Sequence, residues 1–371
     1  MTSTIFLNCH FSADERDREW YFGGQYTEAL PSRGPRQTDL AAVVTDGSVS
    51  FYAASIKWWC CEDLVAPQPQ RPPLAMHFSI ALSLFLTALK ATTAKPLRAK
   101  PTLLVFGDSK TDNGNSYLLT NKTWPADPAY YTGVFSNGPT WPFYLAPLIG
   151  ASHIINHAYA SATVNNSIAA GVGGVNFDIP IPSVTDQVAE FIASGQEERC
   201  RKPETLVVLY IGANDAFFGG PTLDVAALTT SLLRNVQLLV DQGFRRFLLS
   251  GSQDNVLQPF YAMPSVDQAA RDALGAYSKN WKGNITTALA QARFPRSVVV
   301  TLWDEYAAVK AIKEEAVETG VDVTVPCLQG AFGEVAERKL CADPAQHLFF
   351  DTYHPSTLMH ASVARSIHAA L

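Results

Sequence analysis

Short apolar runs alternate with longer amphipathic stretches along the chain from about residue 95 onward. The apolar runs predict buried strands at 102–106, 152–156, 205–211, Arg246–Ser250 and 297–302. Helical periodicity predicts helices at 141–149, Val184–Ala193, 222–242, 267–293, 306–319 and 355–371.

This alternation predicts an α/β fold. Strands that alternate with helices form βαβ units and a mostly parallel sheet. Continuously apolar strands require helices on both faces of that sheet. Ligands in such folds bind beyond the carboxyl ends of the strands, so the residues directly after each apolar run are the candidates for function.

A twelve-residue apolar run at 78–89 does not fit the alternating pattern. It is shorter than the roughly 20 residues that span a bilayer, but it matches the apolar core of a secretory signal peptide. Met76 lies just upstream, and small residues follow up to Ala94. We therefore predict a signal peptide at 76–94, a mature domain at 95–371, and secretion to the extracellular space.

The 75 residues before Met76 mix Pro, Gly, Arg and Trp without clear periodicity. We interpret residues 1–75 as a misassigned or disordered extension, with Met76 as the true start. The alternative is a genuine N-terminal segment followed by an internal buried helix. The N-terminal sequence of the secreted product distinguishes the two.

Composition narrows the possible partners. The chain has 371 residues, of which 47% are hydrophobic and 17% charged, and its net charge is −6. The hydrophobic content suits a well-filled core, and the negative charge argues against a nucleic-acid partner. We expect a monomer without stable membrane insertion.

Six cysteines are present, without CxxC spacing, so we expect no metal site. In an oxidising compartment Cys327 and Cys341 could close a ring of about 15 residues, worth roughly 3 kcal/mol. The alternative is two unpaired buried thiols, and a partner for Cys200 stays open. Sequons at Asn121, Asn165 and Asn284 are compatible with a secreted glycoprotein.

Candidate chemistry follows two of the strands. Gly107-Asp108-Ser109-Lys110 comes directly after 102–106, and a serine on such a turn can present its hydroxyl while backbone N–H groups face an oxyanion. After 205–211 comes 212–215, where the amide of Asn214 is a suitable oxyanion donor. The alternative at both places is an ordinary turn.

Asp351 and His354 stand immediately before Pro355, which we expect at the first position of the last helix. At a spacing of three, the carboxylate can reach the imidazole and fix its tautomer, leaving His354 to take a proton from Ser109. The alternative is a capping Asp and an exposed His. The order Ser, Asn, Asp, His at strand ends and before a helix is more specific than any one segment.

Over about residues 100–371 these segments resemble the SGNH hydrolases, also called GDSL lipases and esterases. The resemblance implies a three-layer α/β/α sandwich with a flavodoxin-like parallel sheet of about five strands, and no cofactor or metal. It implies Ser109 as the nucleophile, with its own N–H in the oxyanion hole, Asn214 as a second donor, and Asp351 and His354 as the rest of the triad. Lys110 stands where Leu is usual.

Further stretches are similar to secreted fungal and plant members. They include 131–139 with Trp141, the Cys341-Ala-Asp-Pro segment, and 349–351. Some of the fungal members are carbohydrate acetyl esterases. The second family block departs, because Ala160 and Ser161 replace its two glycines. Either backbone N–H could still serve the oxyanion hole, although a Cβ could crowd the pocket or disfavour a positive φ.

We therefore expect a secreted serine esterase that hydrolyses acyl or acetyl esters through a Ser-His-Asp triad and an acyl-enzyme. Short-chain or carbohydrate acetyl esters, small or borne on a polysaccharide, are the first choice of substrate. The alternatives are a lipase or phospholipase acting on longer chains and a non-catalytic binding protein on the same fold. A phosphate site at 107–114 does not have the spacing of a P-loop.

Overall fold

The computed structural model describes residues 101–220, 222–251, 254–330 and 338–371, together with four strands nearer the N-terminus. The chain divides into two compact units, Met1–Thr92 and Thr93–Leu371. The predicted signal peptide at 76–94 lies outside the described residues, so it stays a prediction.

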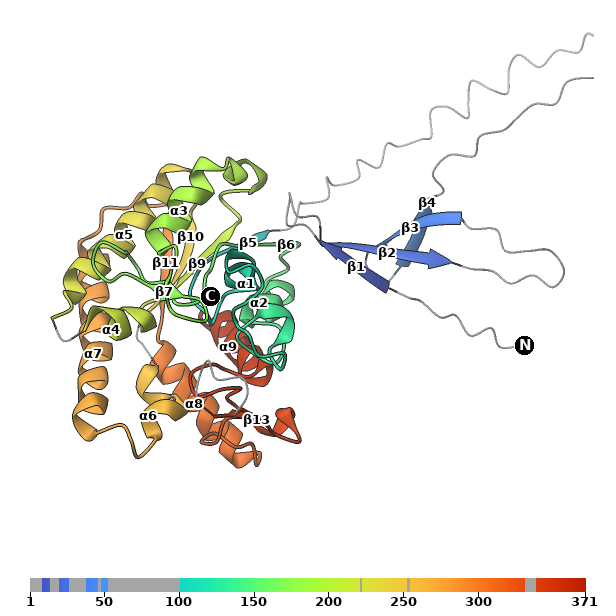
Figure 1. The fold of residues 1–371 in the computed structure, drawn as a ribbon. Helices are drawn as coiled ribbons and strands as arrows, with labels where there is room; N and C mark the ends of the chain where they lie inside the picture. Colours follow the sequence, from blue (N-terminus) through green and yellow to red (C-terminus); the bar gives the residue numbers. More distant parts are fainter. Residues whose placement is uncertain are drawn as a thin grey trace, which may run out of the picture. The chain divides into compact units, whose positions relative to one another are not determined.

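The first unit contains a four-stranded antiparallel sheet, drawn in blue in Figure 1. Its strands follow one another in chain order as β1 (Cys9–Ala13), β2 (Trp20–Tyr26), β3 (Thr38–Thr45) and β4 (Ser48–Tyr52). The sequence pattern predicted no element in this region. The interpretation of residues 1–75 as an extension remains a prediction.

The second unit is built on a five-stranded parallel sheet, as the pattern predicted. The strands are β5 (Thr102–Gly107), β6 (His153–Asn156), β9 (Leu206–Tyr210), β10 (Arg246–Ser250) and β11 (Val299–Trp303). Their order is β11-β10-β9-β5-β6, so the first strand lies between the second and the third. This is the flavodoxin-like order.

Helices cover both faces of this sheet, which confirms the three-layer sandwich (Figure 1). On one face, Leu104 and Phe106 of β5 share a core with α3 (Val184–Ala193), α5 (Val225–Asp241) and α7 (Gln268–Gln291). On the other, Leu103 and Val105 pack with α2 (Trp141–Leu148), α8 (Glu305–Glu318) and α9 (Thr357–Ala370). Successive side chains of a strand point to opposite faces, so one apolar run serves both cores.

Several short elements were not predicted, because segments of so few residues show no helical or strand periodicity. The helices are α1 (Asn115–Leu119), α4 (Ala213–Gly219) and α6 (Pro259–Ala262). The short strands are β7 (Val172–Gly173), β8 (Ile179–Pro180), β12 (Leu328–Gln329) and β13 (Lys339–Leu340).

The start of the last helix differs from the prediction by two residues. Pro355 lies before the helix, because Ser356 keeps an extended backbone as the N-cap and α9 begins at Thr357. Asp351 and His354 therefore lie in the preceding loop, as expected. Within the described part of the chain, no helix combines the length and apolar character that crossing a bilayer requires.

Candidate active site

Three segments far apart in the sequence converge on one cavity of about 280 Å³. Ser109 follows β5, Asn214 lies in α4 after β9, and His354 comes from the loop before α9. All three side chains line the cavity. The carboxyl ends of neighbouring parallel strands thus bring the predicted residues together.

A hydrogen-bonded chain runs from Ser109 to Asp351. Nε2 of His354 lies 3.0 Å from Oγ of Ser109, and its Nδ1 lies 2.9 and 2.8 Å from the two carboxylate oxygens of Asp351. Oδ1 of Asp351 also accepts the backbone N–H groups of Tyr353 and His354 at 2.8 Å. The imidazole is therefore fixed between a hydroxyl and a carboxylate.

Asp351 is fully buried, yet it is held in its charged form. Burial alone would raise the pKa of its carboxyl group, but the neighbouring His354 and the hydrogen bonds it accepts hold that pKa below its usual value. One of these bonds comes from Tyr130, whose Oη donates to Oδ2 at 2.5 Å. The sequence did not indicate Tyr130, since it is 221 residues away along the chain.

Ala160 and Ser161, which replace the two glycines of the second family block, differ in their surroundings. The backbone N–H of Ala160 donates to Oγ of Ser116 at 2.6 Å and to Oδ2 of Asp112 at 3.1 Å. This N–H is already used within the fold, so the expectation that Ala160 serves an oxyanion is corrected. Ser161 lines the cavity at φ 64°, the left-handed region in which glycine is favoured.

The Ser161 turn is fixed by its surroundings. A Cβ on Gly171 would lie 2.3 Å from the carbonyl oxygen of Ser161, so only glycine allows that close approach. Asn214 faces the same region, and its Nδ2 donates to the carbonyl oxygen of Ala162 at 2.9 Å. An amide nitrogen carries two hydrogens, so this bond orients the side chain while the other hydrogen can serve a ligand.

The turn that contains Ser109 is held in place at Gly107, its first residue. Gly107 donates its N–H to Oε1 of Gln187 at 3.0 Å and accepts from Nε2 of the same side chain at 3.0 Å. A Cβ on Gly107 would lie 2.4 Å from the carbonyl oxygen of Tyr210. The turn that carries Ser109 is thus held by a glutamine on α3 and by close contact with β9.

Lys110 anchors the other side of this turn in a buried charged cluster. Its Nζ lies 2.5 Å from Oδ1 of Asp254 and 2.6 Å from Oε1 of Glu305. Oη of Tyr210 donates to the same oxygen of Glu305 at 2.7 Å. Burial raises the pKa of Glu305 well above its usual value, and the nearby Lys110 opposes that shift. The sequence identified Lys110 as unusual but gave no sign of its partners.

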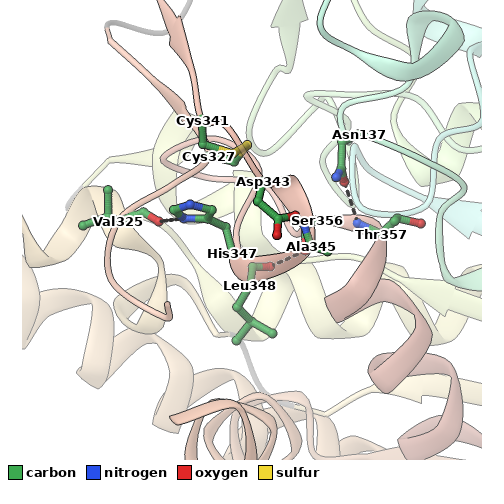
Figure 2. Close-up of a disulfide and its surroundings, with 10 residues drawn as sticks. All are labelled: Asn137, Val325, Cys327, Cys341, Asp343, Ala345, His347, Leu348, Ser356 and Thr357. Carbon is green, nitrogen blue, oxygen red and sulfur yellow. Dashed lines mark hydrogen bonds between the residues drawn. A yellow bond between two sulfur atoms is a disulfide. The ribbon is translucent and has the colours of Figure 1, made fainter. Parts of the chain in front are cut away.

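The Cys327–Cys341 disulfide is formed in the structure, as expected (Figure 2). Figure 2 also shows two hydrogen bonds in the neighbouring segments. Nδ1 of His347 bonds to the carbonyl oxygen of Val325, and the backbone N–H of Thr357 donates to Oδ1 of Asn137. Cys200 is a buried free thiol, and burial raises its pKa to about 11.

The three sequons lie in different settings. Asn121 is exposed at φ 58°. Asn165 is partly buried and donates from Nδ2 to Ser231 at 2.9 Å. Asn284 lies within α7 and donates to the carbonyl oxygen of Asn280. Glycosylation at these sites remains a prediction. The described part of the chain contains no group of three or more His, Cys, Asp or Glu side chains that could hold a metal ion.

Aromatic side chains form much of the cavity wall. They are Trp124, Phe135, Phe177, Phe217, Phe218, Tyr261 and Tyr353. Phe217 is 61% exposed and Phe177 is 40% exposed, so part of this aromatic surface faces solvent. The cavity thus combines a few convergent polar groups with an apolar wall, which is typical of small-molecule sites.

Comparison with known proteins gives a consistent match. The family model described as GDSL-like Lipase/Acylhydrolase matches residues 103–367. A phosphatidylcholine-sterol acyltransferase of Aeromonas hydrophila is 26% identical over 191 residues, 52% of this chain and 52% of that protein. An acetylesterase of Hypocrea jecorina is 27% identical over 186 residues, 46% of this chain and 53% of that protein. The match thus spans about half the length of these relatives.

One solved structure that the chain matches is that of a catalytic mutant of an acetylxylan esterase from Geobacillus stearothermophilus. It is 15% identical, with a TM-score of 0.37, and the match covers 73% of this chain and 93% of that chain.

Proposed function

This chain belongs to the GDSL-like lipase/acylhydrolase family, and on that premise we propose that it is a carboxylic ester hydrolase working through an acyl-serine. The observation that carries the proposal is the 3.0 Å contact between Nε2 of His354 and Oγ of Ser109, with Asp351 bound to the other side of the imidazole. This is the arrangement of nucleophile, base and orienting group that acyl transfer requires.

The reaction begins when Oγ of Ser109 attacks the ester carbonyl and His354 takes its proton. The same proton passes to the leaving alcohol as the carbon–oxygen bond breaks, which leaves an acyl-serine. Water, deprotonated by His354, then attacks the acyl carbon and releases the acid and free Ser109. Asp351 keeps Nδ1–H toward itself and stabilises the imidazolium in both steps.

The negative oxygen of each tetrahedral intermediate needs donors on the cavity side. We assign this role to the backbone N–H groups of Ser109 and Ser161 and to Nδ2 of Asn214. All three residues line the cavity, and the N–H of Ala160 is already bound to Asp112 and Ser116. Fixed donors of this kind stabilise charge as it develops.

Short-chain acyl esters, including carbohydrate acetyl esters, are the proposed substrates. A cavity of about 280 Å³ lies just below the lower end of the roughly 300–1,000 Å³ of drug-sized sites, and one relative is named an acetylesterase. The second candidate is an esterase for longer acyl chains. The exposed aromatic ring of Phe217 supports it, because such a surface could carry a chain beyond the cavity.

We further propose that the protein is secreted. The apolar run at 78–89 within the predicted signal peptide supports this, as does the Cys327–Cys341 disulfide, since such bonds persist in oxidising compartments. N-terminal sequencing of the product in the medium tests the idea. A mature N-terminus upstream of Met76 would contradict it.

The deciding experiment is a p-nitrophenyl ester series from acetate to palmitate. We expect the highest kcat/KM on the shortest chains and loss of hydrolysis in Ser109→Ala. Ser152→Ala is the matched control, since Ser152 is exposed and precedes β6. A fluorophosphonate probe should label the wild type but not Ser109→Ala. A wild type that neither hydrolyses esters nor reacts with the probe would instead be a binding protein.

A further inference from the structure

A buried polar chain continues from Asp351 away from Ser109. Oη of Tyr130 donates to Oδ2 of Asp351 at 2.5 Å, and Nη1 of Arg338 donates to Oη of Tyr130 at 3.0 Å. The side chain of Arg338 is only 3% exposed, and its guanidinium lies 5.4 Å from the centre of the Tyr130 ring. An arginine thus lies two hydrogen bonds from the carboxylate that holds His354.

The direction of these hydrogen bonds follows from the groups themselves. A guanidinium has donors and no acceptor, so it must donate to the phenol oxygen. Tyr130 has a single hydroxyl hydrogen, which is then directed at Asp351. Burial and the nearby Asp351 raise the pKa of Tyr130 well above its usual value, although Arg338 opposes this shift, so the hydroxyl keeps that hydrogen. Arg338 also faces the buried carboxylate of Asp127, whose Oδ2 lies 4.0 Å from Nη1.

The disulfide connects this arginine to the chain beside Asp351. Arg338 directly precedes β13, which pairs with β12 through Leu328 and Leu340. The N–H of Leu328 in turn donates to the carbonyl of Phe350. The Cys327–Cys341 bond closes the end of this pair. The disulfide therefore joins the strand next to Arg338 to β12, and backbone hydrogen bonds join β12 to the segment that leads to Asp351.

We propose that Tyr130 and Arg338 are positioning residues that act on Asp351, and that the Cys327–Cys341 disulfide holds Arg338 against Tyr130. This inference rests on the proposed esterase function. Neither residue lines the cavity, so neither touches substrate. Their effect reaches Ser109 only through Asp351 and His354.

The hydrogen bond from Tyr130 has two consequences for Asp351. It holds Oδ2 while two backbone N–H groups hold Oδ1, so that both oxygens meet Nδ1 of His354. It also draws negative charge away from Oδ2, which moderates how strongly Asp351 stabilises a protonated imidazole. Without it Oδ2 loses a donor, and the stronger charge of the carboxylate favours the imidazolium, the form that cannot accept a proton from Ser109.

The first test is Tyr130→Phe. We expect kcat/KM on p-nitrophenyl acetate to fall about tenfold, and the acidic limb of its pH profile to move to higher pH. Tyr131→Phe is the matched control, because Tyr131 is 46% exposed and outside the cavity lining. A pH profile of Tyr130→Phe that superimposes on that of the wild type overturns the inference.

The second test asks whether Arg338 acts through Tyr130. Arg338→Met should lower kcat/KM and shift the acidic limb in the same direction, and Arg338→Lys should recover part of both, since an ammonium still donates. Lys339→Met, at the adjacent exposed position, should match the wild type. The double variant Tyr130→Phe/Arg338→Met should be no worse than Tyr130→Phe alone. Fully additive losses contradict the proposed order of action.

The third test removes the disulfide by reduction or by Cys327→Ala/Cys341→Ala. In the otherwise unchanged protein we expect the acidic limb of the pH profile to shift as it does in Arg338→Met. In Arg338→Met itself, removal of the disulfide should shift that limb little further. An unchanged profile after complete reduction overturns the role of the disulfide.

The outcomes separate this inference from the proposed function. A wild type that is inert toward esters and the fluorophosphonate probe refutes the esterase itself. If the wild type is active and both Tyr130→Phe and Arg338→Met have the pH profile of the wild type, only the positioning role is refuted. Should Tyr130→Phe fail to fold, Arg338→Met and its recovery in Arg338→Lys still decide the matter.

Discussion

Lys110 directly follows the proposed nucleophile Ser109 in the sequence, and its ammonium lies 2.6 Å from Oε1 of Glu305. The side chains are 5% and 0% exposed, and Asp254 lies 2.5 Å from the same nitrogen. One buried cation therefore serves two carboxylates. A leucine at position 110 would remove the cation that both carboxylates contact.

We expect Lys110→Met to lower the free energy of unfolding by about 3–5 kcal/mol, because removing one partner leaves buried charges uncompensated. Urea denaturation measures this loss. Lys282→Met is the control, since the Lys282–Asp304 pair is 54% and 36% exposed and such pairs contribute about 1 kcal/mol or less. Equal stability of the two variants would show that the cluster contributes nothing specific.

The positive φ of Ser161 predicts a stabilising substitution. A non-glycine residue in the left-handed region costs roughly 1–2 kcal/mol, and glycine loses about 0.5–1 kcal/mol through its greater freedom in the unfolded chain. Ser161→Gly should therefore raise the free energy of unfolding by about 0.5–1 kcal/mol and retain hydrolysis, because the backbone N–H is kept.

Ala160→Gly is the matched control for Ser161→Gly, since Ala160 is not among the residues with positive φ. At position 160 glycine adds freedom to the unfolded chain but relieves no backbone strain, so we expect the free energy of unfolding to fall by about 0.4–1 kcal/mol. A gain in stability from Ser161→Gly together with a loss from Ala160→Gly would support backbone strain at Ser161. A loss of stability at both positions would contradict it.

The sheet and the central residues of the site could be predicted because their signals are local. Each buried strand is a continuous apolar run, and a parallel sheet places the residue after each run at one edge. Ser109, Asn214 and His354 therefore meet in one cavity, although 105 and 245 residues separate Ser109 from the other two.

The supporting residues could not be predicted because their partners are distant and their types are ordinary. Tyr130 meets Asp351 across 221 residues, and Lys110 meets Asp254 and Glu305 across 144 and 195. A single Asp or Glu in a polar stretch looks like a surface residue until the fold buries it. The occupied N–H of Ala160 likewise depends on where α1 packs.

The role of Asn214 can be tested by its effect on turnover. Asn214→Ala should lower kcat by about 10²–10³, the usual cost of one oxyanion donor, with little change in KM because the charge exists only in the transition state. Asn280→Ala, at an exposed position of α7, is the control. A variant with lower affinity but unchanged kcat would place Asn214 in substrate binding instead.

Asp215 predicts a dependence of stability on pH. The residue is fully buried, and burial raises the pKa of its carboxyl group to about 7. Its Oδ1 accepts the N–H of Val164 at 3.0 Å, whereas its Oδ2 has no hydrogen-bond partner within the part of the chain that the structure describes. The folded protein therefore binds a proton that the unfolded chain has already lost above about pH 4.

The sign follows from this difference in bound protons. Between about pH 4 and pH 7 the folded state holds more protons than the unfolded state, so stability falls as the pH rises. The loss stops above about pH 7 and reaches at most ~4 kcal/mol. An amide in place of this carboxyl group does not titrate, so Asp215→Asn should be more stable than the wild type at pH 8 and lose this advantage toward pH 4.5.

Urea denaturation of both proteins at pH 4.5, 6 and 8 measures the effect, and the difference between them isolates Asp215 from every other titrating group. Asp241→Asn, at an exposed position at the end of α5, serves as the control and should follow the wild type at all three pH values. The contrary result is a stability difference between Asp215→Asn and the wild type that is the same at each pH. The carboxyl group would then not titrate in this range, and a partner for Oδ2 would have to compensate for its burial.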